Sequence, residues 1–545
     1  MKKAHKYIFV VGGVMSGVGK GVTTSSIGML LQSCGYKVNI VKVDPYLNVD
    51  AGTMNPTEHG EVFVLDSGLE TDQDMGNYER FLNRDISHNC YMTSGMVYKT
   101  VIERERALGY KGKCVEAIPD IRDEIISRFN LAAESAKSDI SIIEIGGTVG
   151  DYQNIMFIEA ARVLKIHNPK DVIFIMVSYL PVPGKLGEMK SKPTQNAMRM
   201  LNSYGVQADI LIARSEQGMD EKRREKIAIS CSIRPDYVIS APDVDVIYEV
   251  AGNFEKGNLS KILLDLISLP KRAVDLSPWK DFISKVKNPK REVKIAVVGK
   301  YFDTGDFTLS DAYLSVIEAV KFSAYHNGAK AKLTWLSSKD YEKDPSKLKS
   351  LKNFDGIIVP GGFGESGIEG KLSAIKFARE NKIPYFGLCY GMQLMVIEYA
   401  RNVLGWKDAN TAEITKKSEH LVIDIMLDQE EKLLAKDFGG SMRLGAYPAI
   451  LKKGTVAFLS YETGTISERH RHRYEVSNEF IKDIEKAGLV FSGTSPDGKL
   501  MEIAELPKSV HPFFLGTQFH PEFKARPLSP HPLFSAFIKA ALKKN

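Results

Sequence analysis

The sequence predicts an α/β protein with two doubly wound domains, each built on a mostly parallel sheet. Short runs rich in Val and Ile alternate with longer amphipathic stretches along the chain. A charged stretch with three prolines interrupts this alternation near the middle, after which it restarts. Apolar strands that alternate with helices are typical of parallel sheets covered on both faces. A chain of 545 residues is also too long for one ordinary domain.

In the first half, six apolar runs are expected to be strands because they are rich in Val and Ile and end in, or are followed by, Gly, Ser, Asp or Pro. In chain order they are YIFVVGG, KVNIVKVD, ISIIEIGG, VIFIMVSYL, DILIARS and YVISAP. The amphipathic stretch PDIRDEIISRFNLAAESA is expected to be a helix, and LSKILLDLISL a closing helix. Residues 1–269 form the first expected domain.

Residues 270–293 are expected to link the two domains, because this stretch is charged and rich in proline. The second expected domain, residues 294–545, opens on the run KIAVVGKY. Its further expected strands lie in FDGIIVPGGFG, IPYFGLC, LVIDIML, VAFLSY and FFLGTQFHPEF.

The composition excludes several classes of protein. A net charge of +6 over this length argues against a dedicated nucleic-acid binder. No apolar run approaches the roughly 18 residues of a membrane span, and the start, MKKAHKYIFVVGGVMSG, does not have the pattern of a secretory signal. The five cysteines are scattered without a C-x-x-C pair. This fits a reducing, cytoplasmic environment and excludes a cysteine-rich zinc site.

The segment YIFVVGGVMSGVGKGVTTSSIGMLLQS is expected to be a strand, a glycine-rich turn and a helix. The backbone N–H groups of such a turn bind phosphate oxygens, and Lys20 would reach the β and γ phosphates. The usual G-x-x-x-x-G-K-[ST] pattern is broken, because Val14 holds the first glycine position and Gly21 follows the lysine. The alternative is a flexible glycine turn with an exposed lysine.

Because the loop has no hydroxyl after its lysine, a magnesium ion needs other oxygens, for which Asp74 and Glu144 are candidates. Either carboxylate alone could instead be a solvated cap or turn residue. Lys190, Lys192 and the nearby Thr194 and Gln195 lie about the expected start of a helix. They suit a second polyphosphate, although a solvated basic loop is the alternative for this segment alone.

The segment GLCYG has the form of a nucleophile elbow, with Cys389 at its tip. His520 is the candidate base, and Pro521 favours an extended backbone that brings Glu522 to the same face as His520. The loop PGGFG and the N–H of Tyr390 could form an oxyanion hole. Taken alone, Cys389 would more simply be a buried core cysteine.

The chain resembles known families over nearly its whole length. The second half resembles class I glutamine amidotransferase domains. The first half resembles the synthetase domain of the CTP synthase family in GGVMSGVGKG, KVDPYLNVDAGTMNP, HGEVFVLDSGLETDQDMGNYERF, EIGGTVGD and KSKPTQ, with ERHRHRYEV later in the chain.

The resemblance implies a set of site residues. For ATP they are Gly17, Val18, Gly19, Lys20, Gly21, Val22, Lys42, Asp74, Pro242, Asp243 and Val244; for magnesium, Asp74 and Glu144. For UTP or CTP they are Ser16, Asp151, Tyr152, Gln153, Lys190, Ser191, Lys192, Pro193, Thr194, Gln195 and Lys226. For glutamine they are Gly362, Tyr390, Gly391, Met392, Gln393, Glu413 and Arg473, with Cys389, His520 and Glu522 catalytic.

The implied activity is the amination of UTP to CTP, with ATP phosphorylating the uracil O4 and glutamine or free ammonia supplying nitrogen. The resemblance also implies GTP activation, feedback by CTP, and a homotetramer, a dimer of dimers, that can stack into filaments. One position departs from the family pattern, because Ser366 stands where an arginine usual in a lid loop is expected. This departure puts the strength of GTP activation in doubt.

Two other functions remain open from the sequence. One is a different amidotransferase-linked synthetase of the cobyrinate amidase type, against which DPYLNVD and KSKPTQ argue. The other is a deviant phosphate-loop ATPase whose primary role is to form filaments, against which the Cys-His-Glu set argues.

Overall fold

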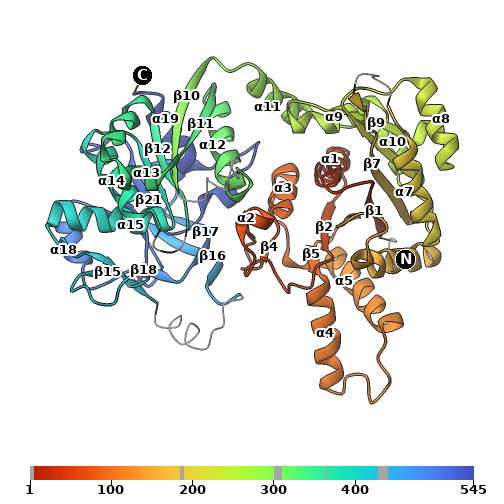
Figure 1. Cartoon of the computed structure of the whole chain (residues 1–545), viewed down its shortest axis with the longest axis horizontal. Coiled ribbons are helices and arrows are strands. Elements are labelled where there is room, and N and C mark those ends of the chain that lie inside the picture. Colours follow the sequence, from red (N-terminus) through yellow and green to blue (C-terminus); the bar gives the residue numbers. More distant parts are fainter. Residues whose placement is uncertain are drawn as a thin grey trace. The chain divides into compact units, whose positions relative to one another are not determined.

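The computed structural model describes residues 5–184, 189–299, 310–362, 364, 366–426 and 440–544. Lys300 and Tyr301 of KIAVVGKY, Phe363 of PGGFG and Leu427 of LVIDIML lie outside the described residues. The chain divides into two compact units (Figure 1). The first comprises Met1–Asp50 and Asn77–Ile283, and the second Ala51–Gly76 and Ser284–Asn545.

The first unit is built on a seven-stranded, fully parallel sheet with the strand order β5-β2-β6-β1-β7-β8-β9. All six strands expected in this half are confirmed, and β5 is an addition. The side chains of β1 and β6 are buried along the whole strand, so both faces of the sheet are covered. The strands are β1 Lys6–Gly13, β2 Val38–Asp44, β5 Tyr91–Thr93, β6 Ile140–Ile145, β7 Val172–Tyr179, β8 Ile210–Ser215 and β9 Val238–Pro242.

Both helices expected in this half are present, as α5 and α10. The α-helices that lie wholly within the first unit are α1 Lys20–Ser33, α4 Ser94–Arg106, α5 Arg122–Ser135, α6 Ile155–His167, α7 Lys192–Ser203, α8 Glu221–Cys231, α9 Val250–Lys256 and α10 Leu259–Leu266. The chain crosses the boundary between the units within α3 Gln73–Leu82 and α11 Ser277–Lys287. The segment expected as a linker therefore contains a helix, whose Trp279 stacks on Tyr248.

The second unit is built on a nine-stranded sheet with the order β11-β10-β12-β13-β21-β20-β19-β16-β17. The first five strands in this order pair in parallel, and the remaining pairs are antiparallel. The strands are β10 Arg291–Gly299, β11 Ala329–Ser337, β12 Gly356–Val359, β13 Tyr385–Leu388, β16 Arg443–Leu451, β17 Thr465–His472, β19 Val490–Thr494, β20 Met501–Glu505 and β21 Phe514–Thr517.

Helices and small sheets surround this core. The helices are α2 Pro56–His59, α12 Leu314–His326, α13 Ser338–Lys343, α14 Ile368–Glu380, α15 Tyr390–Tyr399, α17 Val456–Tyr461, α18 Ile481–Lys486 and α19 Pro532–Ala541. The small sheets consist of β3 Phe63–Val64 with β4 Glu70–Thr71, and of β14 Asn410–Thr411, β15 Leu421–Ile425 and β18 Tyr474–Val476.

The expectation of a strand at VAFLSY is wrong, because this run forms helix α17. Thr455 caps the helix by accepting a hydrogen bond from the N–H of Phe458. The carboxylate of Glu505 accepts hydrogen bonds from the N–H groups of Val456 and Ala457, at 2.6 and 3.0 Å. A six-residue apolar run does not by itself distinguish a strand from a buried helix, and here a carboxylate distant in sequence stabilises the helix end.

Residues 51–76 belong to the second unit although they come from the first half of the sequence. Phe63 packs edge to face on Phe523, with ring centroids 5.1 Å apart. Gly68 approaches Gly445 so closely that a Cβ added to Gly445 would lie 2.5 Å from the Gly68 nitrogen. This packing places the segment directly on β16 and β17.

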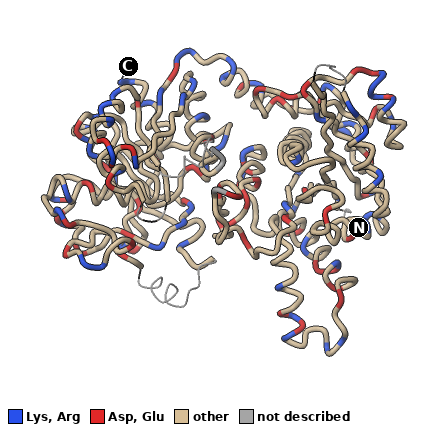
Figure 2. Tube along the Cα trace, viewed as in Figure 1, with Lys and Arg blue, Asp and Glu red and all other residues tan. Residues whose placement is uncertain are grey.

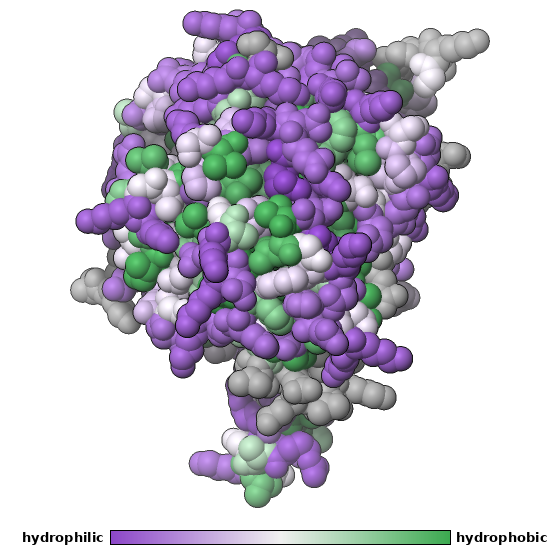
Figure 3. All heavy atoms as spheres, turned by 90° about the vertical axis from the view of Figure 1, so that its left-hand side faces the viewer, coloured by the Kyte–Doolittle hydropathy of each residue, from purple (hydrophilic) through white to green (hydrophobic). Residues whose placement is uncertain are grey.

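The surface carries charges of both signs. Figure 2 shows acidic and basic residues interspersed along the described trace of both units. On the face seen in Figure 3, hydrophilic residues dominate and hydrophobic ones form small separate groups, as is usual for an exposed surface. Within the described residues, no helix is both long enough and apolar enough to cross a membrane.

Candidate active sites

Cys389 lies at the tip of a sharp turn between β13 and α15. Its backbone has φ 49° and ψ −100°, a conformation that residues with a side chain rarely adopt. The two flanking glycines are required by close packing: a Cβ added to Gly391 would lie 2.1 Å from the carbonyl oxygen of Val359, and one on Gly387 would lie 2.7 Å from the carbonyl carbon of Gly391. The nucleophile elbow predicted from GLCYG is therefore present as a turn.

His520 and Glu522 form a hydrogen bond of 2.7 Å between the imidazole Nδ1 and the carboxylate Oε1. The expectation of an extended backbone here is wrong, because Pro521–Lys524 form a turn of 3₁₀ helix that begins directly after His520. Proline is well suited to the first position of a helical turn, since it lacks the N–H that would be unpaired there. The two side chains meet because the chain turns.

The charge environment favours the protonated form of His520. Burial lowers the pKa of its imidazole, but the carboxylate of Glu522 and the thiolate form of Cys389 outweigh burial and raise the pKa to about 10. The Nε2 atom is buried and has no hydrogen-bond partner among the described residues. A Cβ added to Gly361 would lie 2.9 Å from the His520 ring and 3.8 Å from the Cys389 Cβ, so both side chains lie beside this glycine.

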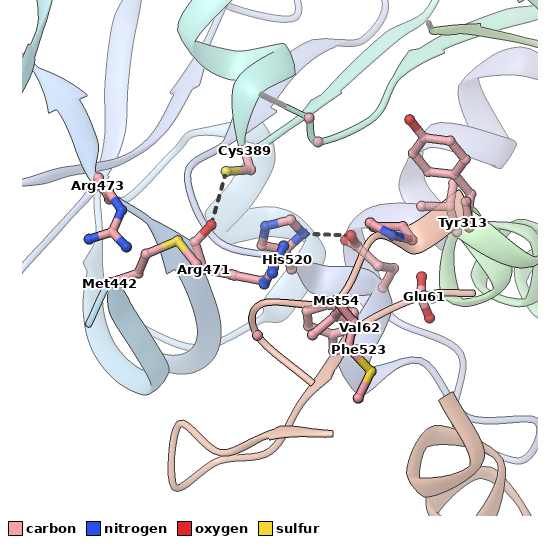
Figure 4. Close-up of a pocket in the computed structure, with 17 residues that line it drawn as sticks. Met54, Glu61, Val62, Tyr313, Cys389, Met442, Arg471, Arg473, His520 and Phe523 are labelled. Carbon is pink, nitrogen blue, oxygen red and sulfur yellow. Dashed lines mark hydrogen bonds and ion pairs between the residues drawn. The ribbon is translucent and has the colours of Figure 1, made fainter. Parts of the chain in front are cut away.

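These residues line a cavity of about 330 Å³ (Figure 4). Its wall consists of Gly52, Met54, Pro56, Glu61, Val62, Ala312, Tyr313, Val316, Gly361, Gly362, Cys389, Met442, Arg471, Arg473, His520, Glu522 and Phe523. The volume is at the lower end of the range for small-molecule sites. An apolar wall with a few polar groups beside a strained cysteine is a suitable setting for acyl chemistry.

The residues expected to hold glutamine are only partly gathered around this cavity. Gly362 and Arg473 line it, and Arg473 also donates a hydrogen bond of 2.9 Å to the Ser441 hydroxyl. Glu413 accepts a 2.7 Å hydrogen bond from the N–H of Gly364. Gln393 is buried and donates to the carbonyl of Tyr474 at 3.0 Å. Tyr390, Gly391 and Met392 belong to the buried first turn of α15.

In the first unit, the glycine-rich loop connects β1 to α1, as expected from the sequence. Gly17 and Gly19 have positive φ, and Gly19 is the residue directly before the helix. Lys20 is the first residue of α1, and its ammonium donates a 2.7 Å hydrogen bond to the carbonyl of Gly147. The loop thus presents a helix N-terminus and a lysine at the carboxyl edge of the sheet, a suitable site for phosphate.

A second, smaller cavity of about 130 Å³ lies beside the helix that follows this loop. Val22 lines it together with Pro242, Asp243 and Val244. These four residues were expected to contact ATP from two distant segments, and the structure brings them together. Arg214, which the sequence did not indicate, also lines the cavity and donates a hydrogen bond of 2.5 Å to Asp243.

Glu144 lies at the carboxyl end of β6 and is buried. Its carboxylate accepts hydrogen bonds from the Lys42 ammonium at 3.1 Å and from the Tyr78 hydroxyl at 2.5 Å. Asp74, in the first turn of α3, belongs to the other unit. The joint magnesium site of Asp74 and Glu144 therefore stays a prediction.

The residues expected to bind UTP or CTP differ widely in exposure. Tyr152 is 91% exposed, and Lys226 is exposed on α8. Thr194 is buried, with its hydroxyl 2.7 Å from that of Ser178. Lys192 is the first residue of α7 rather than a residue before the helix. The remaining ones lie in the exposed loop (Ser16), in the turn before α6 (Asp151, Gln153) and around the start of α7 (Lys190, Ser191, Pro193, Gln195).

Several lining residues of the larger cavity were not identified from the sequence, among them Arg471 and five residues between Gly52 and Val62. Arginine and histidine alternate along the run RHRHR, residues 469–473. In a strand this period of two places the arginines on one face, which was the available signal for Arg471. No comparable local pattern marks the segment Gly52–Val62.

Two family models match separate parts of the chain. The family model of the CTP synthase N-terminus matches residues 6–269, and that of class I glutamine amidotransferases matches residues 308–540. A CTP synthase of Carboxydothermus hydrogenoformans is 50% identical over 541 residues, which cover 99% of each chain.

A CTP synthase of Halalkalibacterium halodurans is 47% identical over 540 residues, again 99% of each chain. Among solved structures, the glutaminase domain of Trypanosoma brucei CTPS with bound acivicin is 38% identical. That match covers 46% of this chain and 95% of the other, with a TM-score of 0.43.

Proposed function

The chain belongs to the CTP synthase family and catalyses the ATP-dependent amination of UTP to CTP with nitrogen from glutamine, and we propose that its two sites divide this reaction between them. The site around Cys389 releases ammonia from glutamine. The site around the phosphate loop activates UTP. The observation that carries the first assignment is the strained Cys389 in one cavity with the hydrogen-bonded pair His520 and Glu522.

Glutamine hydrolysis proceeds through a thioester. The thiolate of Cys389 attacks the side-chain amide, and the imidazolium of His520 donates a proton to the departing nitrogen, which leaves as ammonia. Neutral His520 then removes a proton from water, which attacks the thioester and releases glutamate. Glu522 keeps Nδ1 protonated and holds the ring in place, so that Nε2 performs both proton transfers. Arg473, Glu413 and Gly362 hold the amino-acid end of glutamine.

In the other site, the γ-phosphoryl group of ATP is transferred to O4 of UTP, and ADP leaves. Ammonia then attacks C4, and the bond from C4 to the phosphorylated oxygen breaks, giving CTP and phosphate. Lys20 and the N–H groups of the loop neutralise the charge on the phosphates. Pro242, Asp243 and Val244 contact the adenine side, since they line one cavity with Val22.

The remaining nucleotide contacts are proposed from the family pattern. For ATP they are Gly17, Val18, Gly19, Gly21, Lys42 and Asp74. For UTP or CTP they are Ser16, Asp151, Tyr152, Gln153, Lys190, Ser191, Lys192, Pro193, Thr194, Gln195 and Lys226.

Asp74 and Glu144 are the proposed protein ligands of a magnesium ion. Within the described residues, no group of three or more His, Cys, Asp or Glu could hold a metal ion. Mg²⁺ is usually bound by one or two carboxylates together with substrate phosphates and water, so two protein carboxylates are a sufficient set of ligands. A magnesium ion bound by these carboxylates would neutralise charge on the phosphates. Lys42 and Tyr78 keep the Glu144 carboxylate directed into a buried, polar position.

The functional domains are proposed as a synthetase domain of residues 1–269, a linker of residues 270–293 and an amidotransferase domain of residues 294–545. The ranges of the two family matches support these boundaries. Residues 51–76 then belong in function to the synthetase and in packing to the second unit. We further propose a cytoplasmic homotetramer, a dimer of dimers that can form filaments, with GTP as activator and CTP as feedback inhibitor.

Replacement of Cys389 by alanine tests the division of labour. The variant should lose glutamine-dependent CTP formation by at least about 10³-fold, since a missing nucleophile removes the covalent route. It should retain near-normal CTP formation with ammonium salt at alkaline pH, because activation of UTP needs no residue of this site. CTP formation from UTP and ATP with each nitrogen source is followed by absorbance. Glutamine-dependent synthesis at the wild-type rate would show that Cys389 is a core residue without a catalytic role.

A further inference from the structure

One strand, β17, contacts Cys389 and His520 through its backbone. Its side chains contact two acidic residues of segment 51–76. We propose that the ion pairs Asp66–Arg469 and Glu70–Arg471 hold β17 in place beside Cys389. Asp66 and Glu70 are then positioning residues for glutamine hydrolysis. The inference rests on the proposed roles of Cys389 and His520.

Alternate carbonyl groups of β17 face the catalytic residues and their neighbours. The Ser467 carbonyl accepts a 3.0 Å hydrogen bond from the Lys524 ammonium. The Arg469 carbonyl accepts a 2.8 Å hydrogen bond from the backbone N–H of His520. The Arg471 carbonyl lies 3.8 Å from the Sγ atom of Cys389, a contact drawn in Figure 4. A shift of this strand would therefore move the base and the surroundings of the nucleophile together.

The side chains of the same two arginines bind segment 51–76. Arg469 is fully buried and donates to the Asp66 carboxylate at 2.5 Å and to the Val64 carbonyl at 3.1 Å. Arg471 donates to the Glu70 carboxylate at 2.7 Å. Residues two apart in a strand share a face, so both ion pairs lie on one face of β17.

The opposite face of β17 carries His470 and His472, whose side chains are also buried. Burial, followed by the nearby Arg443 cation, holds the pKa of both imidazoles well below the usual value. They therefore add no charge on that face at neutral pH. Glu468 shares that face, and its carboxylate accepts a 2.8 Å hydrogen bond from the Tyr461 hydroxyl and lies 3.0 Å from the His531 Nε2 atom. The charged side chains of β17 that bind segment 51–76 are those of the two arginines.

The place of β17 in the sheet explains why its position depends on the two ion pairs. It is the last strand in the nine-strand order and pairs with β16 along one edge. Its other edge carries the carbonyl groups that face His520 and Cys389. A strand held by a neighbouring strand on one edge depends on other contacts for its exact position. Glu70 is 1% exposed and Arg471 is largely buried, so this ion pair is weakly screened by water.

Removing the negative charge from Glu70 should lower glutamine hydrolysis. In Glu70→Gln, the guanidinium of Arg471 loses its ion pair with the Glu70 carboxylate, which should let the Arg471 side chain and β17 shift. We expect kcat for glutamate release to fall by about tenfold, because small displacements of catalytic groups have effects of this order. The KM for glutamine should change by less than about twofold, and CTP formation from ammonium salt should stay within about twofold of wild type.

Alkylation of Cys389 reports on the nucleophile without turnover. Purified wild-type and variant proteins are treated with iodoacetamide, and the modified Cys389 peptide is quantified by mass spectrometry. Glu70→Gln should be alkylated more slowly at Cys389 by about the same factor as kcat falls. Asp66→Asn should show the same changes to a smaller degree, because Asp66 is 40% exposed while Glu70 is buried.

Two further variants separate charge from packing. Glu70→Asp keeps the charge and should retain more activity than Glu70→Gln. Glu58→Gln is the matched control, because it makes the same chemical change on an exposed side chain of the same segment and should behave as wild type. Equal losses in Glu70→Asp and Glu70→Gln would overturn the ion-pair assignment.

The outcomes for this inference and for the proposed function are distinguishable. Wild-type kcat and alkylation rate in Glu70→Gln, alongside an inactive Cys389→Ala, would overturn the inference alone. A parallel fall of ammonia-dependent synthesis in Glu70→Gln would also overturn it, since the role would then be general stability. Glutaminase activity that survives in Cys389→Ala would overturn the proposed function itself.

Discussion

Cys389 shows how a single residue can be strained for its task. Its positive φ costs an estimated 1–3 kcal/mol, and the surrounding packing has to overcome this cost. A backbone hydrogen bond of 2.6 Å from the Cys389 N–H to the Thr517 carbonyl and the close packing of Gly391 on Val359 hold the turn. The strained turn places the buried thiol directly before α15, where it lines the cavity.

The pKa of His520 gives a prediction at the same scale. Glu522 and Cys389 raise this pKa to about 10, above the ordinary value of about 6.5. Protonated His520 therefore stabilises the folded protein fully below about pH 6.5, and this contribution is lost as the pH rises towards 10.

Glu522→Gln removes one of the two charges responsible. Its midpoint of thermal unfolding should lie below that of wild type at pH 6, and the difference should shrink as the pH is raised to about 10. Unfolding followed by circular dichroism at several pH values measures this difference. A difference that is constant with pH would show that Glu522 does not interact with an ionised His520.

At the scale of a single element, the residues of the phosphate loop that would bind phosphate lie close together in the sequence. Its helix N-terminus, its glycines and Lys20 all lie within one short stretch between β1 and α1. The N–H groups of a first helical turn have no partner within the helix and are available to phosphate oxygens.

Lys20→Ala should abolish CTP formation with either nitrogen source. Loss of one charge contact to the transition state costs about 10²-fold or more. Basal glutamine hydrolysis should persist, because Lys20 and Cys389 lie in different units. Rates of CTP formation and of glutamate release by the same preparation test this. Near-normal synthesis by the variant would refute the loop assignment.

At the scale of the whole molecule, the proposed activation by GTP gives a further prediction. Ser366 is exposed in the turn before α14, where the family pattern has an arginine. A serine hydroxyl cannot replace the fixed cation and bidentate donors of a guanidinium. The chain is therefore expected to respond weakly to GTP.

Ser366→Arg should increase GTP activation by up to about tenfold, the ratio that a charged hydrogen bond typically supports. The measurement is glutamine-dependent CTP formation with and without GTP. Ser366→Lys serves as a control that adds charge without the planar donor geometry. Strong activation of the wild-type protein would remove the basis of this argument.

The sequence by itself determined the features whose chemistry is local. Three features depend on residues close together in the chain: the strand–loop–helix around Lys20, the elbow at Cys389 and the pairing of His520 with Glu522. Their sequence patterns therefore predict them without a structure. Even here the backbone differed from expectation, since a 3₁₀ turn rather than an extended strand brings His520 and Glu522 together.

Tertiary structure alone decided what depends on contacts between distant residues. VAFLSY is a helix because Glu505, 49 and 48 positions away, bonds its first N–H groups. Segment 51–76 belongs to the second unit because Asp66 and Glu70 bind arginines 403 and 401 positions further on. Propensity and periodicity describe a residue's neighbours in sequence, whereas a buried ion pair depends on which surfaces the whole chain brings together.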